Sequence, residues 1–285
     1  MPVILCAVDK AETAQRVVDT ARWLADAWRA RLVVMHAVGK ADRDVDELAA
    51  SIGDRLGGAD ANVRFVEGPP IATIMEAAER ERPELLVVGS RGHGPLRSAV
   101  LGSVSRELAS RARCPVVVVP SGERWTRPAD GAEDTKASVV CGVDGSEQAL
   151  AASTLAGRTA TQLGCRLVVV HARQNLRAAV SYRGAHPATP PLSGQEDAVR
   201  LRAAEVIERA EVAAGVSAVG VVEPGPPAEV LESVANREGA RLIVIAARGL
   251  GGLGTALLGS VAAQLSTSAA RPVMVLSEAA ARAMT

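Results

Sequence analysis

Two strings of glycine and serine residues with matching spacing are the best candidates for chemistry in this chain. The first begins Gly89-Ser90-Arg91-Gly92 and, after nine further residues, reaches Gly102-Ser103. An apolar run over 85–88 precedes it, and a helix-forming stretch follows. Glycines let backbone N–H groups approach a phosphate closely, and a helix start adds unpaired donors and the positive end of the helix dipole. The string therefore predicts an anion-binding loop.

A second copy of the string occurs in the other half of the chain. Ala246-Ala247-Arg248-Gly249 is followed by nine residues and then by Gly259-Ser260. Ala246 stands where the first copy has Gly89. Alanine is harmless there if φ is negative, and disruptive if φ is positive or if a ligand packs against the Cα. Arg91 and Arg248 hold equivalent positions, where they face either phosphate oxygens or solvent.

The strings are part of a longer internal repeat. Residues 6–9 match 141–144, residues 31–37 match 166–172, and Gly68-Pro69-Pro70 matches Gly225-Pro226-Pro227. The offset grows between the second and third matches, so the second half carries an insertion within 173–194, a stretch typical of a loop. We predict a first α/β domain over 1–120, a linker over 121–136, a second α/β domain over 137–277 and a C-terminal tail over 278–285.

Short apolar runs alternate with longer amphipathic stretches in both halves. The runs are rich in Val and Ile and nearly continuous, as expected of strands buried on both faces. Their alternation with helical stretches predicts parallel sheets with helices on both faces. Ligands of such sheets bind beyond the carboxyl ends of the strands. Asp9, His36 and Gly89 all lie at those ends, so one pocket per domain could contain them.

The amino-acid composition argues against several classes of function. The chain has 32 basic and 32 acidic residues and only five aromatic side chains of the Phe, Tyr and Trp types, which argues against nucleic-acid binding. No apolar run is long enough to span a membrane, and 1–9 read as a strand rather than a signal peptide. Cys6 and Cys141 occupy equivalent strand positions and are expected to be buried. Together these features predict a cytoplasmic protein without membrane insertion.

The combination of the glycine strings, Val-Asp after the first strand and Val-x-His in the second resembles the universal stress protein family in tandem form. The resemblance implies two doubly wound five-stranded parallel sheets with strand order 3-2-1-4-5. It also implies ATP binding, with Mg²⁺ accompanying the nucleotide. The residues implied for the first site are Ala7, Val8, Asp9, Ala37, Gly89, Arg91, Gly92, Gly102, Ser103 and Val104. Those implied for the second are Val143, Asp144, Ala172, Ala246, Gly249, Gly259, Ser260 and Val261.

The two implied sites depart from the family pattern in different ways. The first half has Asp9-Lys10-Ala11 where the second has Asp144-Gly145-Ser146. The first half keeps all the loop glycines, whereas the second has Ala246. We therefore expect the sites to differ in affinity. The aspartates are alternatively N-caps of the helices that follow them, and His36 and His171 are expected to be structural side chains bonded to the backbone.

Three functional hypotheses follow. The chain lacks a P-loop string and a recognisable catalytic triad, which favours a nucleotide-binding regulatory or stress-response protein with no more than weak ATPase activity and no assigned catalytic residue. The alternatives are a degenerate structural or dimerisation module and a slow ATP-hydrolysing or nucleotidyl-transfer enzyme. Residues 116–120 and 273–277 would be apolar edge strands, so we expect them to pair, in a homodimer or in an intrachain pseudo-dimer.

Overall fold

A computed structural model gives the structure of the chain over residues 1–9, 14–38, 52, 62–90, 101–121, 137–173, 193–250 and 257–284. The chain divides into two compact units. The first comprises Met1–Asp134, Ala246–Arg248 and Gly252–Thr285, and the second Thr135–Ile245 and Gly249–Gly251. The C-terminal part of the chain thus belongs to the first unit, and the domain boundaries drawn from the repeat stay a prediction.

The strands coincide with the predicted apolar runs to within about two residues at each end. They are β1 (Val3–Val8), β2 (Arg31–Val38), β3 (Asn62–Glu67), β4 (Leu85–Gly89), β5 (Val116–Val119), β6 (Ser138–Gly142), β7 (Arg166–Arg173), β8 (Ala218–Pro224), β9 (Ala240–Ala246) and β10 (Val273–Leu276). Every residue of β1, β5 and β10 is buried. This burial explains the nearly continuous Val and Ile runs, because a central parallel strand is covered on both faces.

In the first unit the strands follow the order β3-β2-β1-β4-β5-β10. The first five are parallel, which confirms the expected 3-2-1-4-5 arrangement. Strand β10 pairs antiparallel with β5, with Met274 opposite Val117. The expected pairing of these two apolar strands is therefore present, and neither strand exposes this edge to solvent.

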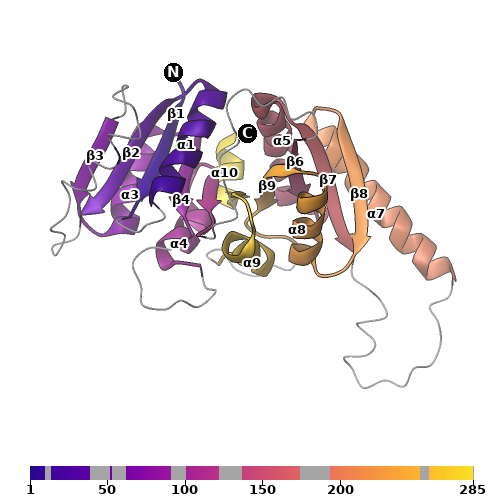
Figure 1. Ribbon diagram of the computed structural model, residues 1–285. Coiled ribbons are helices and arrows are strands. Elements are labelled where there is room, and N and C mark those ends of the chain that lie inside the picture. The colour runs from indigo at the N-terminus through magenta and orange to yellow at the C-terminus, as the bar shows by residue number, and fades with distance from the viewer. Residues whose placement is uncertain are drawn as a thin grey trace. The chain divides into compact units, whose positions relative to one another are not determined.

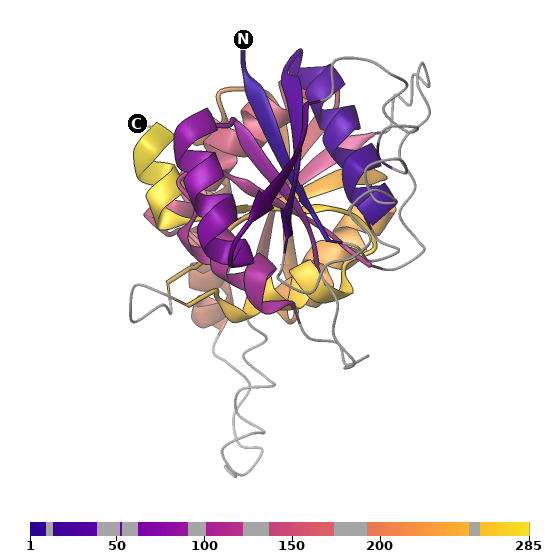
Figure 2. The ribbon, with the colours of Figure 1, turned by 90° about the vertical axis from the view of Figure 1, so that its left-hand side faces the viewer.

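Helices cover both faces of the first unit's sheet. Figure 2 shows α1 on one side of the strands and α3 on the other. The helices whose bounds the structure describes in this unit are α1 (Ala14–Trp28), α3 (Pro70–Glu81), α4 (Ser103–Arg111), α9 (Ser260–Ser268) and α10 (Glu278–Met284). The sequence predicts a C-terminal tail over 278–285, whereas Glu278–Met284 form a helix in the structure.

The second unit repeats the arrangement with strand order β9-β6-β7-β8, all parallel. Its described helices include α5 (Glu147–Leu163), α7 (Ser193–Ala214) and α8 (Pro227–Arg237). Helices α5 and α7 pack together on one face of these strands, and α8 covers the other (Figure 1). Both units are therefore α/β layers with helices on both faces, as the sequence predicts.

An ion-pair network centred on Glu81, at the end of α3, joins this helix to strands β2 and β3 and includes Arg31, Arg64 and Arg80. The Glu81 carboxylate accepts a hydrogen bond from Arg64 Nη1 at 2.6 Å and one from Arg31 Nη2 at 3.0 Å. The Glu81 side chain is 12% exposed. The hydrogen bond from Arg64 is the main reason that the pKa of Glu81 lies below its ordinary value, with Arg31 adding to the effect.

We expect Glu81→Gln to lower the free energy of unfolding at pH 7 by about 1–3 kcal/mol, because it removes charge-assisted bonds from a mostly buried acceptor. A carboxyl with a lowered folded-state pKa stabilises the protein above its unfolded pKa, and that stability is lost as pH falls through the folded pKa. Urea denaturation between pH 7 and pH 3 should therefore show a flatter acid limb in the variant. The control is Glu107→Gln, which breaks the more exposed pair with Arg111 and should change stability by less than about 0.5 kcal/mol. If Glu81→Gln and Glu107→Gln lowered the free energy of unfolding equally, the Glu81 network would stabilise the protein no more than an exposed ion pair does.

Candidate functional site

The first-half loop connects the end of β4 to the start of α4. Gly102 is the N-cap residue of α4, and its N–H donates to the carbonyl of Ser90 at 2.9 Å. In the described part of the chain no side chain caps this helix. Its first backbone N–H groups, at Ser103 and Val104, are therefore available to an acceptor from outside the helix.

Strand register brings other predicted residues to the same end of the sheet. Val8 at the end of β1 lies opposite His36 on β2, and Ala7 lies opposite Val88 on β4. The carboxyl ends of β1, β2 and β4 are thus adjacent, which gathers Ala7, Val8, Asp9, Ala37 and Gly89 beside the start of α4. Arg91 and Gly92 lie outside the described residues.

His36 and His171 have the structural role that the sequence analysis expected. Nδ1 of His36 lies 2.9 Å from the carbonyl oxygen of Val8, and Nδ1 of His171 lies 2.9 Å from that of Val143. A carbonyl oxygen only accepts, so Nδ1 carries the proton and donates in both rings. Each imidazole ties the end of one strand to its neighbour and holds the backbone at the edge of the candidate site.

Two buried serines also hold the first loop, and the sequence analysis did not single them out. Ser105 Oγ donates to the carbonyl of Gly89 at 2.5 Å, and Ser90 Oγ accepts from the N–H of Ser121 at 3.1 Å. Ser90 is 1% exposed. A comparison of the two repeats could have identified these serines, because the second repeat has Ala247 and Ala262 at the positions equivalent to Ser90 and Ser105. The hydroxyl bonds are therefore specific to the first loop.

In the second unit the Asp144 carboxylate forms hydrogen bonds with the backbone of two loops. Its Oδ1 accepts from the N–H of Ser146 at 3.0 Å, and its Oδ2 accepts from the N–H of Leu250 at 2.8 Å. A Cβ at Gly249 would overlap this carboxylate, so the close approach requires glycine. The N-cap of α5 is Ser146, whose Oγ accepts from Ala149 N–H at 3.2 Å. Asp144 therefore bonds to the loop, and Ser146 caps the helix.

The remaining residues of the second string belong to the first unit. Gly259 N–H donates to the carbonyl of Ala247 at 2.8 Å, which repeats the bond of Gly102. Arg248 Nε donates to the carbonyl of Leu257 at 2.6 Å, so this guanidinium bonds to its own loop. Ala246 does not have a positive φ, so alanine suits the backbone there. Ser260 and Val261 are the first residues of α9.

The predicted second-half residues therefore fall into two groups. One group, in the second unit, is Val143, Asp144, Ala172 and Gly249; the other, in the first unit, is Ala246, Arg248, Gly259, Ser260 and Val261. The first-half residues that the structure describes all lie within the first unit. The first site is thus the more complete of the two candidates.

The buried cysteines are not nucleophiles at neutral pH. Cys6, Cys114 and Cys141 are buried free thiols. Desolvation raises the pKa of Cys6 far above its ordinary value and raises the pKa of Cys141 to about 12. The expectation that Cys6 and Cys141 are buried is confirmed.

Within the described ranges no three His, Cys, Asp or Glu side chains come together as metal ligands. No helix there has the length and apolarity to cross a bilayer.

Known proteins resemble this chain in both sequence and fold. A model of the universal stress protein family matches residues 40–120 and 137–277. Universal stress protein Rv2005c of Mycobacterium tuberculosis is 31% identical over 211 residues, which cover 74% of this chain and 67% of the relative. Universal stress protein Rv2623 of the same organism is 34% identical over 194 residues, which cover 68% of this chain and 61% of the relative. The crystal structure of a putative universal stress protein from Pseudomonas aeruginosa has a TM-score of 0.68 at 18% identity and covers 99% of this chain and 96% of its own.

Proposed function

The chain belongs to the universal stress protein family, and from this premise we propose that its first half binds ATP and that the protein acts as a nucleotide-responsive regulatory or stress-response module. One observation carries the proposal. The start of α4, with Gly102 at its N-cap and no side-chain cap in the described part of the chain, lies at the same end of the sheet as the carboxyl ends of β1 and β2. Such a helix start suits a phosphate group.

In this proposal different residues bind different parts of the nucleotide. Ala7, Val8 and Ala37 offer backbone groups at the strand ends to the adenine and ribose, beside Asp9. The backbone N–H groups of Ser103 and Val104, beside the N-cap Gly102, bind the phosphates, together with the loop that contains Gly89, Arg91 and Gly92. The bonds of Ser90 and Ser105 hold the two ends of this loop before the ligand arrives, which lowers the cost of ordering it.

Mg²⁺ would enter with the phosphates in this proposal. The described residues offer no cluster of three metal-binding side chains. Magnesium keeps several waters and commonly binds through one or two carboxylates and substrate phosphates. Its role would be to screen the charge of the triphosphate.

We propose binding rather than catalysis as the main activity. The described part of the first site presents backbone groups and small side chains. Slow ATP hydrolysis or nucleotidyl transfer remains the enzymatic alternative. Two further predictions from the sequence also stay proposals: a cytoplasmic location, and a homodimer or intrachain pseudo-dimer. The antiparallel pairing of β5 with β10 supports the pseudo-dimer, since these are the last strands of the two repeats.

The direct test is to identify what the protein binds. Acid release from freshly purified protein, followed by chromatography, should yield an adenine nucleotide. Calorimetric titration of nucleotide-free protein should show binding of ATP. If purified protein contains no nucleotide and calorimetry detects no ATP binding at millimolar concentration, the degenerate structural module becomes the better description.

We expect the two halves to bind ATP unequally. The Asp144 carboxylate already accepts the Leu250 N–H, so this N–H of the second loop is not available to a phosphate, whereas the described part of the first loop has no such bond to a carboxylate. Calorimetry should require two affinities or find fewer than two nucleotides per chain. Ala246→Gly should change the affinities little, because Ala246 has no positive φ. Two equal and independent sites in the unmodified protein would contradict this expectation.

A further inference from the structure

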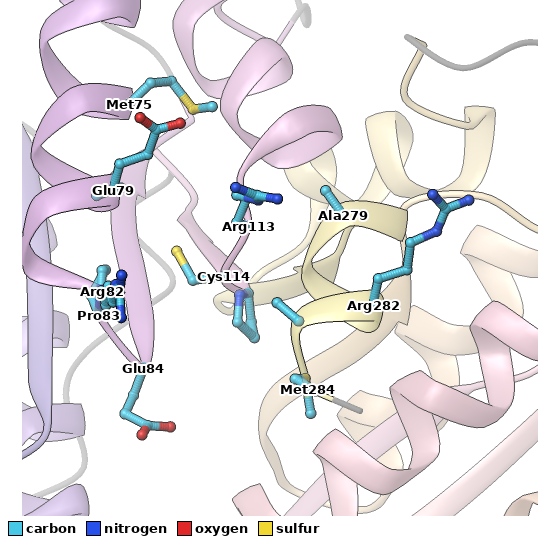
Figure 3. A pocket seen from close by; sticks show the side chains of 13 residues that line it. Met75, Glu79, Arg82, Pro83, Glu84, Arg113, Cys114, Ala279, Arg282 and Met284 are labelled. Atoms are coloured by element: carbon cyan, nitrogen blue, oxygen red, sulfur yellow. The ribbon is translucent and has the colours of Figure 1, made fainter.

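A cavity of about 760 Å³ lies at the other end of the first unit's sheet, before β4 and β5 begin. Helix α3 forms one wall, helix α10 forms another, and the segment between α4 and β5 forms the floor (Figure 3). The candidate ATP site lies beyond the carboxyl ends of the strands, so the cavity is a separate site. Its volume is within the range of pockets that bind small organic molecules.

Apolar side chains form part of the floor and part of the walls. Cys114 is 7% exposed and lies between α3 and α10 (Figure 3). Burial raises the pKa of its thiol to about 12, so it stays neutral and contributes as an apolar surface. Met75 on α3 and Met284 on α10 line the same space. Methionine side chains adapt to ligands of different shape.

The wall formed by α10 is held in place by a serine. Ser277 Oγ donates to the carbonyl of Ala112 at the end of α4, at 2.5 Å, and accepts from the N–H of Ala280 at 2.9 Å. The hydroxyl therefore caps α10 and ties it to α4, and Ser277 is fully buried. The cavity is thus bounded by a fixed helix.

Arg82 stands at the rim in an unfavourable backbone conformation. It follows α3 with φ 44° and ψ 59°, in the left-handed region that favours glycine. The second repeat has Gly239, with φ 60°, at the equivalent position. Strained residues that persist in a fold suggest a use for the side chain. In the first repeat, the strain places a guanidinium at the cavity.

Arg113 adds a second cation at the floor, and this cation is also specific to the first repeat. Its counterpart in the second repeat is Ala270. Within the described residues neither Arg82 nor Arg113 has a carboxylate or carbonyl partner for its guanidinium. Arg282 pairs with Glu278 instead. The acidic side chains at the cavity are Glu79, which has no cationic partner within the same described ranges, and Glu84.

We propose that this cavity binds an amphipathic organic anion, with its carboxylate at Arg82 and Arg113 and its apolar body along Cys114, Met75 and Met284. Two guanidinium groups attract a carboxylate, and the apolar side chains beside them shelter a hydrocarbon chain. The site is independent of the ATP site proposed above, and its ligand should bind with ATP already present.

The test uses decanoate as the probe and isothermal calorimetry as the measurement. Decanoate should bind the full-length protein, with or without saturating ATP. Arg82→Gly and Arg113→Gln should each weaken its binding about tenfold or more, since each removes a charge-assisted bond. Arg82→Gly should also raise the melting temperature, because glycine relieves the left-handed φ.

The chain offers a matched control for this variant. Arg29 follows α1 with φ 47°, does not line the cavity, and corresponds to Gly164 in the second repeat. Arg29→Gly should raise the melting temperature in the same way and leave decanoate affinity unchanged. Equal binding of decylamine would overturn the proposal, because that cation has the same chain. Unchanged decanoate affinity in both Arg82→Gly and Arg113→Gln, or no binding of decanoate to the unmodified protein at millimolar concentration, would also overturn it.

Discussion

Replacing Gly102 by glutamate should weaken ATP binding about thirtyfold or more, with the protein still folded. Gly102 is the N-cap of α4, and the N–H groups that follow it are the proposed phosphate donors. A carboxylate at this position would compete for those donors and repel the phosphates. Charge at a helix N-terminus contributes up to about 2 kcal/mol in favourable, partly buried geometries, which corresponds to about thirtyfold in affinity. Calorimetry with ATP provides the measurement, and circular dichroism checks the fold.

Two variants at the same position separate charge from bulk. Gly102→Gln has nearly the same size as the glutamate and no charge, so its loss of affinity should be smaller. Gly102→Ala should lose least, because the φ of −57° at Gly102 accommodates any residue. If the folded glutamate variant binds ATP as tightly as the unmodified protein, the phosphates do not bind at the start of α4, and the site assignment is wrong.

Replacing Gly157 by leucine should destabilise the second unit by about 3 kcal/mol or more. Helices α5 and α7 approach closely at this residue, where a Cβ would overlap the carbonyl group of Ala214. The obstacle is backbone, which cannot rotate away, and Thr154 Oγ bonds to the neighbouring carbonyl of Ala213 at 2.8 Å. Overpacking of a close contact usually costs about 1–3 kcal/mol for small additions, and leucine adds four carbons.

The alanine variant at Gly157 tests which of two effects is larger. Alanine gains up to about 1 kcal/mol of helix propensity over glycine, yet its Cβ meets the same carbonyl. We expect a net loss of about 1–2 kcal/mol in urea denaturation. The control is Gln162→Ala, on the exposed surface of α5, which should change stability by less than about 0.5 kcal/mol. A Gly157→Ala protein more stable than the unmodified one would show that the helices separate at little cost.

Comparing the two repeats shows which contacts each glycine-rich loop shares with the other and which it does not. The first loop has Ser90 and Ser105 where the second has Ala247 and Ala262. The second loop is closed by Asp144 and by the bond from Arg248 to Leu257. The two loops share the bond from the N-cap glycine to the end of the preceding strand and differ in the side chains that support it. This difference is the physical basis for expecting unequal sites.

Several features followed from local sequence alone. A nearly continuous run such as 85–88 is buried on both faces, so its hydrophobicity by itself predicts a central strand of a parallel sheet. The roles of His36 and His171 could likewise be inferred, because a histidine near the end of a buried strand has the neighbouring strand's backbone within reach. The position of the candidate ATP site stays a prediction from the sequence, which rests on parallel strands placing their carboxyl ends together.

Tertiary structure decided the features that depend on residues distant in sequence. Asp144 bonds to Leu250 rather than to its own helix, and Ser277 ties α10 to Ala112, so that a predicted tail becomes the wall of a cavity. The left-handed φ of Arg82 is set by the chain's path from α3 into β4, and arginine by itself does not indicate it. The local pattern of apolar residues predicts which face of a helix or strand is buried. The hydrogen-bond partner of a polar group depends instead on which donor and acceptor the folded backbone brings together.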